Sequence, residues 1–366
     1  MAETVEERDR RYMGMACRLA LRAVGRTSPN PMVGAVLVRH GQIVGRGFHR
    51  FAGADHAEIV AIKQAGARAR GATLYLNLEP CVHQGRTPPC APALIKAGIK
   101  EVVVGMRDPN PAVAGRGLAA LRRAGIAVRS GVLSEQCERL NEAFTKYITR
   151  KLPFVTLKLA ASLDGRIATA GGDARWVTGS AARHEVHELR NRLDAVLVGA
   201  GTVLADNPRL TCRIAGGRDP WRVILDGRLR IPLEARLLHE RAREKNIIVT
   251  GTRVSARKIR ALESLGAQVW RFGLRGGLVP WRAVLKRLAR IGITSVLVEG
   301  GAATAASALR DRAVDKVLLF YAPKIFGGDG RSMIDSVGVT RVGRAIRLER
   351  IEVARRGEDI RVTGYL

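Results

Sequence analysis

The feature that most constrains the fold of this 366-residue chain is a set of three metal-binding side chains that must come together in space. His56 opens a His-x-Glu motif that ends at Glu58, and Cys81 and Cys90 each follow a proline. One imidazole and two thiolates suit zinc, and three protein ligands leave the fourth tetrahedral position open, as in a catalytic site. A water can be activated at that position. Glu58 is a carboxylate that can reach the metal without ligating it.

Local patterns place the ligands at the ends of regular elements. Asp55 is a suitable N-cap, so residues 56–62 predict the start of a helix with the histidine in its first turn. Residues 72–78 predict a buried strand that ends just before Cys81, where a second helix can begin. Helix N-termini lower thiol pKa values, which favours Cys81 and Cys90 as thiolates. Core cysteines beside a buried histidine are the structural alternative, and the Pro-Cys at both thiols favours the metal site.

These motifs resemble the zinc-dependent nucleobase deaminases, with one departure. Eight residues separate Cys81 from Cys90, where that group has two. With this insertion the motif is similar to the pyrimidine deaminase family of riboflavin biosynthesis, and so are residues 27–34 and 108–117. The resemblance implies a cytidine-deaminase-like domain that binds zinc.

Hydrolytic deamination of an aminopyrimidine needs a hydroxide at neutral pH and a group that moves protons to the ring nitrogen and the departing amine. Zinc supplies the first requirement, and Glu58 is the catalytic residue predicted for the second. Asn30 offers an amide suited to a pyrimidine edge, and capping of a turn is its alternative role. His49, His83 and Arg86 are the other candidate substrate contacts, with a solvated histidine as the competing interpretation of His49.

The length of the chain predicts two domains, over residues 1–148 and 149–366. The first has the order of a three-layer α/β/α sandwich. Its predicted elements are a helix at 7–24, strands at 32–38, 42–48, 72–78 and 101–106 interleaved with helices, and one helix at 134–150 that leads into the second domain.

The second half alternates strands with helices. The predicted strands are 154–160, 195–199, 221–226, 246–249, 295–298 and 316–321, and the predicted helices are 180–192, 254–264, 281–290 and 302–311. This alternation predicts a largely parallel sheet covered on both faces, with ligands at the carboxyl ends of the strands. Small-residue turns at 199–202 and 298–302 suit phosphate groups, although neither is a complete dinucleotide fingerprint.

Residues 158–166, 175–178, 201–208 and 298–301 are similar to the reductase of the same pathway. The resemblance implies a dihydrofolate-reductase-like α/β domain that uses NADPH to reduce a ribosyl sugar to a ribityl chain. Matched positions imply cofactor contacts at Ala160, Trp176, Thr202, Asp206, Gly227, Gly301, Ala302 and Ala303. They imply substrate contacts at Ala174, Arg190, Leu210, Arg213 and Glu299. Gly227 stands where the family often has serine, and a turn-capping role is the alternative for Asp206.

A zinc-dependent deaminase domain followed by an NADPH-dependent reductase domain resembles the bacterial bifunctional family of riboflavin biosynthesis. The expected substrate is 2,5-diamino-6-(5-phosphoribosylamino)pyrimidin-4-one, which is deaminated and then reduced. The resemblance also leads us to expect a homo-oligomer, either a dimer or a tetramer.

The net charge of +29 makes a nucleic-acid (tRNA) base deaminase with an accessory α/β domain the alternative function. The basic excess is spread over both halves, and aromatic residues, which stacking on bases requires, make up 4% of the chain. Basic surface also attracts phosphorylated substrates and NADPH. We therefore expect no nucleic-acid partner.

The compartment is predicted from features that the sequence lacks. The acidic start of the chain has no secretion-signal pattern, and no apolar run approaches the ~18 residues of a membrane span. Cys17, Cys137 and Cys212 are interpreted as reduced core thiols. We expect a cytoplasmic protein without a membrane partner.

Overall fold

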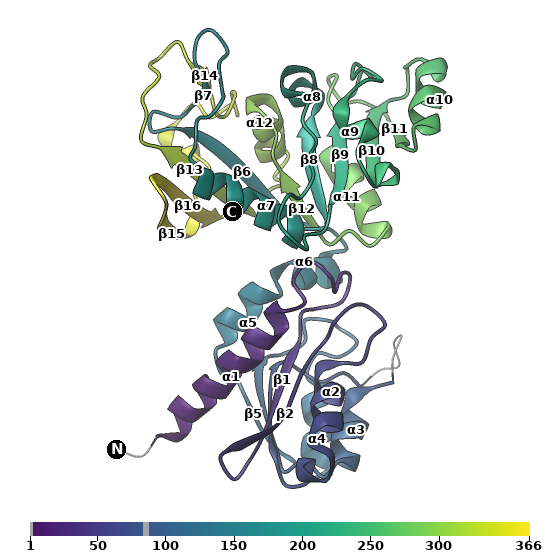
Figure 1. Cartoon of the computed structure of the whole chain (residues 1–366), viewed down its shortest axis with the longest axis vertical. Coiled ribbons are helices and arrows are strands. Elements are labelled where there is room, and N and C mark those ends of the chain that lie inside the picture. Colours follow the sequence, from purple (N-terminus) through teal and green to yellow (C-terminus); the bar gives the residue numbers. More distant parts are fainter. Residues whose placement is uncertain (1–2, 83–87) are drawn as a thin grey trace. The chain divides into compact units, whose positions relative to one another are not determined.

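The computed structural model describes residues 3–82 and 88–366 and divides into two compact units, Met1–Leu152 and Pro153–Leu366 (Figure 1). The division lies four residues beyond the expected position 148, because the helix at Glu142–Arg150 belongs to the first unit as a whole. We call the two parts the amino-terminal unit and the carboxy-terminal unit.

The elements of the amino-terminal unit are α1 (Val5–Leu21), β1 (Gly34–Arg39), β2 (Gln42–Phe48), α2 (Ala57–Ala65), the 3-10 helix η1 (Gly66–Ala69), β3 (Thr73–Leu78), α3 (Cys90–Lys96), β4 (Glu101–Met106), α4 (Arg116–Arg123), β5 (Ala127–Ser130), α5 (Ser134–Leu140) and α6 (Glu142–Arg150). Within the described part of the unit they form one five-stranded sheet in the order β2-β1-β3-β4-β5. β1 is antiparallel to β2 and β3, whereas β3, β4 and β5 are parallel.

Helices cover both faces of this sheet, as a three-layer sandwich requires (Figure 1). Alternate side chains of a strand point to opposite faces, so Leu74 and Leu76 pack with α2, α3 and α4 while Tyr75 packs with α1 and α5. Since both faces of the sheet are covered by apolar packing, functional groups can gather only at the polar ends of strands such as β3 and β4.

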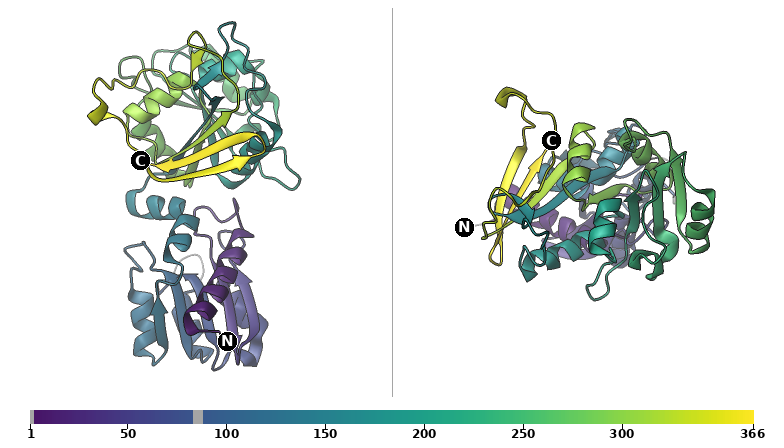
Figure 2. Two further views of the ribbon diagram at one scale, coloured as in Figure 1. Left: turned by 90° about the vertical axis from the view of Figure 1, so that its left-hand side faces the viewer. Right: turned by 90° about the horizontal axis from the view of Figure 1, so that it is seen from above.

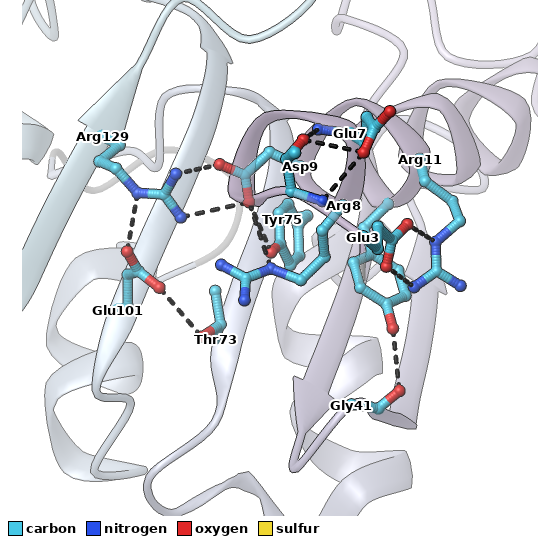
Figure 3. A network of polar contacts seen from close by, with 12 residues as sticks. Glu3, Glu7, Arg8, Asp9, Arg11, Gly41, Thr73, Tyr75, Glu101 and Arg129 are labelled. Carbon is cyan, nitrogen blue, oxygen red and sulfur yellow. Dashed lines mark hydrogen bonds and ion pairs between the residues drawn. The ribbon is translucent and has the colours of Figure 1, made fainter. Parts of the chain in front are cut away.

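The amino ends of the parallel strands carry a polar network that is already paired (Figure 3). Asp9 of α1, which is 2% exposed, accepts a hydrogen bond of 2.8 Å from the Tyr75 hydroxyl and forms an ion pair with Arg129. Arg129 also pairs with Glu101 at 2.8 Å, and Glu101 accepts a hydrogen bond from Thr73. Burial and the neighbouring Asp9 raise the pKa of Tyr75 to about 12, so its hydroxyl remains a donor. This network ties α1 to β3, β4 and β5.

One helix predicted at 134–150 is wrong, since two helices, α5 and α6, occupy this segment. The break is at Asn141, which has φ −110° and ψ 19°. Its side chain accepts a hydrogen bond from Met32 N at 2.8 Å and donates to Met32 O at 3.1 Å. A contact with Met32, a residue more than a hundred positions away in sequence, therefore interrupts a segment whose local pattern is helical.

The elements of the carboxy-terminal unit are β6 (Phe154–Ser162), β7 (Arg166–Ala168), α7 (Ser180–Arg192), β8 (Ala195–Gly199), α8 (Ala200–Asp206), β9 (Trp221–Leu225), α9 (Arg236–His239), η2 (Arg243–Lys245), β10 (Asn246–Gly251), α10 (Ala256–Ser264), β11 (Gln268–Phe272), α11 (Trp281–Arg290), β12 (Ser295–Val298), α12 (Ala302–Arg310), β13 (Lys316–Ala322), β14 (Arg331–Ser332), η3 (Val342–Arg344), β15 (Glu349–Arg356) and β16 (Asp359–Tyr365).

In residues 153–366, all of which the structure describes, the main sheet has nine strands in the order β11-β10-β9-β8-β12-β6-β13-β16-β15. The seven strands from β11 to β13 are parallel, which confirms the largely parallel sheet predicted from the sequence. Val196 and Val198 pack with α8 and α10 on one face, and Leu197 on the other face is also fully buried.

The antiparallel hairpin β15–β16 at one edge of this sheet was not predicted (Figure 2). Its outer strand carries exposed Ile351 and Val353 between charged residues, so the pattern lacks the continuous apolar run of a buried strand. Among the described residues, no helix is both long and apolar enough to cross a lipid bilayer.

Candidate functional site

Helix α2 carries His56 and Glu58 and lies unusually close to β2. A Cβ atom at Gly47 would lie 2.0 Å from the carbonyl oxygen of Ala57, and one at Gly45 would lie 2.3 Å from that of Ala61. Only glycine at these two strand positions allows the backbones to approach so closely. The glycines of β2 therefore fix the position of the helix start that bears the metal ligand.

His56 is itself the N-cap of α2, with φ −70° and ψ 156°, so the prediction of Asp55 as cap was wrong. The Asp55 carboxylate instead accepts an ion-pair contact of 2.6 Å from Lys63. Because His56 has an extended backbone, its imidazole points away from the helix and toward Cys81, which follows β3.

The two cysteines lie at the carboxyl end of β3, but only one opens a helix. Cys90 is the first residue of α3, whereas Cys81 lies in the chain that leaves β3, so the helix predicted to begin near Cys81 begins nine residues later. The amides of Cys90 and Ala91 donate to the carbonyl oxygen of Cys81 at 3.1 and 3.2 Å, which joins the two segments.

The donor atoms of His56, Cys81 and Cys90 all lie within 4.8 Å of one another. His56 Nδ1 is 2.9 Å from Cys90 Sγ and 3.7 Å from Cys81 Sγ. Ligands at bond lengths of ~2.0 to 2.3 Å around a tetrahedral zinc ion are separated by about 3.5 to 3.8 Å, so the residues fit this ion with small adjustments. The hydrogen bond with Cys90 and the contact with His56 lower the pKa of Cys81 to about 4, which favours the thiolate that a metal needs.

Glu58 lies beside the three donors and is 3% exposed. Burial raises the pKa of its carboxyl group. Its Oε2 atom is buried and has no hydrogen-bond partner in the described part of the chain. A buried, unpartnered carboxyl oxygen next to a metal-binding triad suits a group that exchanges protons with a bound water or substrate.

A cavity of about 270 Å³ opens onto these residues. It is lined by Pro29, Asn30, Pro31, Val33, His49, Gly53, His56, Glu58, Leu78, Glu79, Cys81, Asp108, Asn110, Phe144, Tyr147 and Ile148. Two of the three metal donors, His56 and Cys81, thus line the same pocket as Glu58 and two of the predicted substrate contacts, Asn30 and His49.

His49 is buried and hydrogen-bonded, which contradicts the solvated interpretation. Its Nδ1 lies 3.2 Å from the carbonyl oxygen of Asp55, and its Nε2 lies 3.0 Å from Asn30 Nδ2. Burial lowers the pKa of His49, so the ring is neutral, donates to Asp55 and accepts from Asn30. This arrangement orients the Asn30 amide.

His83 and Arg86 lie outside the described residues. The sequence did not identify the pocket residues Glu79, Asp108 and Asn110 as part of the site, although residues 108–117 carried one of the family-like motifs. The signal was a strand end followed by Asp-Pro-Asn-Pro, which places polar groups at the carboxyl edge of β4 beside Cys81.

In the carboxy-terminal unit, four of the eight predicted cofactor residues lie where two helices begin. Gly301 is the N-cap of α12, with Ala302 and Ala303 in the first turn, and Thr202 lies in α8. A Cβ at Gly301 would lie 3.9 Å from Thr202 Oγ1, so the two segments are neighbours. Ala160 lies in β6, and Gly227 follows β9, where an added Cβ would come within 3.3 Å of Leu274.

Trp176 and Asp206 are exposed residues of the same unit. The guanidinium of Arg183 lies 4.7 Å from the centre of the Trp176 ring, and Lys324 donates a hydrogen bond of 2.8 Å to the Trp176 carbonyl oxygen. Asp206 ends α8, and its carbonyl oxygen accepts a hydrogen bond of 3.1 Å from Arg175. An indole that is 64% exposed is a surface on which a flat ligand can stack.

Of the predicted sugar contacts, Arg190 and Glu299 form a bidentate ion pair with two distances of 2.7 Å, and both side chains are about nine-tenths buried. Burial opposes ionisation of Glu299, but the charge of Arg190 and its hydrogen bonds outweigh this and lower the pKa of Glu299. Leu210 is buried, Ala174 is half-buried and Arg213 is exposed.

Two titratable residues beside this pair were absent from the predicted set. Burial lowers the pKa of Lys158, whose charge interacts with those of Glu299 and Arg190. Burial and the charges of Arg190 and Arg213 lower the pKa of His187 to about 4. A lysine within an apolar strand was the available signal for Lys158, because an isolated ammonium group is rarely buried without a function or a partner.

Family comparisons match both units. Residues 153–362 match the family described as "RibD C-terminal domain", and residues 6–106 match the "Cytidine and deoxycytidylate deaminase zinc-binding region". Among curated proteins, the chain is 43% identical over 357 residues to the riboflavin biosynthesis protein RibD of Aquifex aeolicus, covering 97% of this chain and 98% of that protein. The RibD of Escherichia coli is 37% identical over 96% of this chain and 98% of its own length.

Solved structures give the same result over the whole length. Acinetobacter baumannii RibD aligns with a TM-score of 0.88 and 39% identity, covering 98% of this chain and 99% of that chain. The diaminohydroxyphosphoribosylaminopyrimidine deaminase/5-amino-6-(5-phosphoribosylamino)uracil reductase of Thermotoga maritima aligns with a TM-score of 0.86 and 40% identity, covering 99% of each chain.

Proposed function

This chain belongs to the RibD family of bifunctional riboflavin-biosynthesis enzymes, and from this membership we propose which of its residues carry each of the two reactions. The family has a zinc-binding deaminase domain and a pyrimidine reductase domain, and both are present here in that order. The alternative of a tRNA base deaminase is not favoured, because the relatives match the second unit as well as the first.

In the deaminase, His56, Cys81 and Cys90 would hold the zinc ion. When bound, the zinc supplies a water acidified enough to attack the amidine carbon at neutral pH. Glu58 would take one proton from the attacking water and deliver it to the ring nitrogen, and then take the proton of the newly formed hydroxyl group and pass it to the amine, which leaves as ammonia. The unpartnered Oε2 of Glu58 supports this role. Asn30 binds the edge of the pyrimidine, and His49 holds the Asn30 amide in place.

In the reductase, NADPH is the proposed hydride donor. The starts of α8 and α12 would receive its phosphates through backbone N–H groups, with Thr202, Gly301, Ala302 and Ala303 nearest. Trp176 offers its exposed ring, and Asp206 lies at the end of α8. The remaining proposed cofactor contacts are Ala160 and Gly227.

Arg190 and Glu299 would bind the phosphorylated sugar together with Arg213, while Ala174 and Leu210 shape the same site. The buried ion pair supports this proposal because it fixes the direction of both polar groups. The chain's residues orient the sugar and the cofactor and exclude water.

The single observation that carries the function is the convergence of three zinc-donor atoms within 4.8 Å beside Glu58, whose Oε2 is buried without a partner, next to a pocket that His56, Glu58 and Cys81 line. The test is to incubate the purified chain with 2,5-diamino-6-(5-phosphoribosylamino)pyrimidin-4-one and to follow ammonia release and product mass. We expect the deaminated pyrimidine without NADPH and its ribityl form with NADPH. Absence of ammonia release from the zinc-loaded protein would overturn the proposed deaminase.

A cytoplasmic location and a dimeric or tetrameric assembly remain predictions. Light scattering of the purified chain decides the assembly.

A further inference from the structure

Glu79 is a buried carboxylate at the carboxyl end of β3, two residues before Cys81. It is 3% exposed, and it lines the deaminase pocket. Neither the metal site nor the proton transfers described above use this residue. The hydrogen bonds of its carboxylate lead to one segment of chain, residues 108–118.

Four backbone amides of this segment donate to Glu79. Oε2 accepts from the amides of Asp108 at 3.1 Å and Gly115 at 2.9 Å. Oε1 accepts from those of Gly117 at 2.9 Å and Leu118 at 3.2 Å. Each carboxylate oxygen therefore receives two N–H donors, which uses the full capacity of an acceptor-only group.

Two of these amides belong to the first turn of α4, which has no cap of its own. The N-cap is Gly115, with φ 90° and no side chain, so Glu79 replaces the missing cap from another element. A Cβ at Gly117 would lie 2.1 Å from the carbonyl oxygen of Pro80, so the helix start lies directly against the backbone that bears Glu79.

The segment that Glu79 holds forms part of the pocket wall, because Asp108 and Asn110 line the cavity. The wall is also bonded internally, since the amide of Asn110 donates to Asp108 Oδ1 at 2.8 Å and the amide of Ala112 donates to Asn110 Oδ1 at 3.1 Å. Glu79 joins this braced turn to the strand end that leads to the metal ligand.

We propose that Glu79 is a positioning residue of the deaminase: its carboxylate holds residues 108–118 as the pocket wall that binds the pyrimidine substrate. The inference rests on the deaminase function proposed above. Glu79 acts on substrate binding through Asp108 and Asn110. It does not position the zinc ligands.

The test is Glu79→Gln in the full-length, zinc-loaded chain. A glutamine keeps the shape but replaces one oxygen by an NH₂ group, which faces two N–H donors and cannot accept from them. We expect the deaminase KM to rise by about tenfold or more, since a shift of ~1 Å in a positioning group costs up to about 100-fold. Zinc content, and the visible spectrum of the cobalt-substituted protein, should stay unchanged.

The matched control is Asp9→Asn, which alters another buried carboxylate, at the opposite end of the same sheet. It should lower the thermal stability of the amino-terminal unit and leave the KM unchanged. A shorter carboxylate, Glu79→Asp, keeps both acceptor oxygens and the charge, and we expect it to fold with an intermediate KM.

The proposal is wrong if Glu79→Gln and Asp9→Asn give the same KM, or if Glu79→Gln loses zinc in parallel with activity. Should Glu79→Gln fail to fold, Glu79→Asp decides, because an unchanged KM in that variant contradicts the proposal. A wild-type chain that releases no ammonia would instead contradict the deaminase function itself, so the two failures are distinguishable.

Discussion

In the amino-terminal unit, three side-chain atoms lie within 4.8 Å of one another beside a free carboxyl oxygen, whereas half of the proposed cofactor contacts of the carboxy-terminal unit lie along two helix starts. The metal centre depends on the chemical identity of four side chains. The proposed cofactor region would depend on backbone amides and on the absence of a side chain at positions such as Gly301. Conservative substitutions should therefore abolish deamination at the first site, while a change of bulk should damage the second site most.

The largest expected effect is loss of the metal. Cys81→Ser/Cys90→Ser should remove nearly all zinc and all deaminase activity, because a serine hydroxyl does not replace a thiolate. Elemental analysis of the purified variant measures this. Cys212→Ser, which changes a thiol of the other unit, should keep full zinc content. Full occupancy in the double variant would disprove the ligand assignment.

Glu58→Gln should separate proton transfer from metal binding. We expect the rate of deamination to fall by ~10²- to 10⁴-fold with zinc retained. The amide keeps the size of the carboxyl group but cannot accept and release a proton. Steady-state ammonia release measures the loss. NADPH oxidation with the already deaminated intermediate serves as the control and should be normal. Near-normal deamination would remove Glu58 from the mechanism.

Gly301→Leu tests the cofactor region in the opposite way. The first carbon of the new side chain is accommodated, because a Cβ there would meet only Thr202 Oγ1, at 3.9 Å, among the described residues. The KM for NADPH should nevertheless rise by roughly tenfold or more, since the cofactor must approach this backbone. Gly343→Leu, at a position with no described atom within 4 Å of the added Cβ, is the matched control. If Gly301→Leu lost deamination as severely as reduction, with the fold intact by circular dichroism, the two activities would not depend on separate sites.

Asp206→Ala should have a smaller effect on the same cofactor. Loss of one hydrogen-bonding group corresponds to about 2- to 10-fold in affinity. We expect the KM for NADPH to rise within this range and ammonia release to stay nearly unchanged. Kinetics at varied NADPH concentration decide the matter, and an unaltered KM would leave Asp206 with the capping role alone.

The smallest effect concerns Asp164, an exposed carboxylate in the turn after β6. The hydrogen bond from Ser162, with those from the amides of Gly327 and Phe326, lowers its pKa from 3.8 to about 2. A depressed pKa means that this stabilisation is present above pH ~4 and is lost as the pH falls toward 2. The stability gap between wild type and Asp164→Asn should therefore shrink over that range. All four tryptophans lie in the carboxy-terminal unit, so their fluorescence reports its unfolding. A gap that is constant from pH 7 to pH 2 would contradict the assignment.

Local chemistry explains what the sequence could predict. Apolar runs such as 195–199 and 295–298 are buried strands because seven parallel strands lie under helices. The zinc triad was recognisable because its donors are side-chain atoms whose types and spacing are written in the chain. The predicted Asp55 cap failed because His56 takes the cap conformation itself.

Features that depend on distant partners were not predictable in this way. The helix break at Asn141 arises from its bonds to Met32, and the role of Glu79 arises from amides more than 25 residues away. The sequence shows Lys158 as a lysine within an apolar strand, but the neighbouring charges of Glu299 and Arg190 come from the tertiary structure. In each case local sequence shows a polar residue, and the tertiary structure supplies the partner that gives it a function.

The paired network at the amino ends of β3, β4 and β5 bears on how this enzyme could be redesigned (Figure 3). Asp9 and Arg129 hold the sheet together from the end that the pocket does not use. New substrate preferences can therefore be sought by varying Asn30 and Asn110 in a library, with Asp9, Arg129 and Glu79 kept constant. In such a library, the constant residues would maintain the folding yield, and selection could act on substrate preference alone.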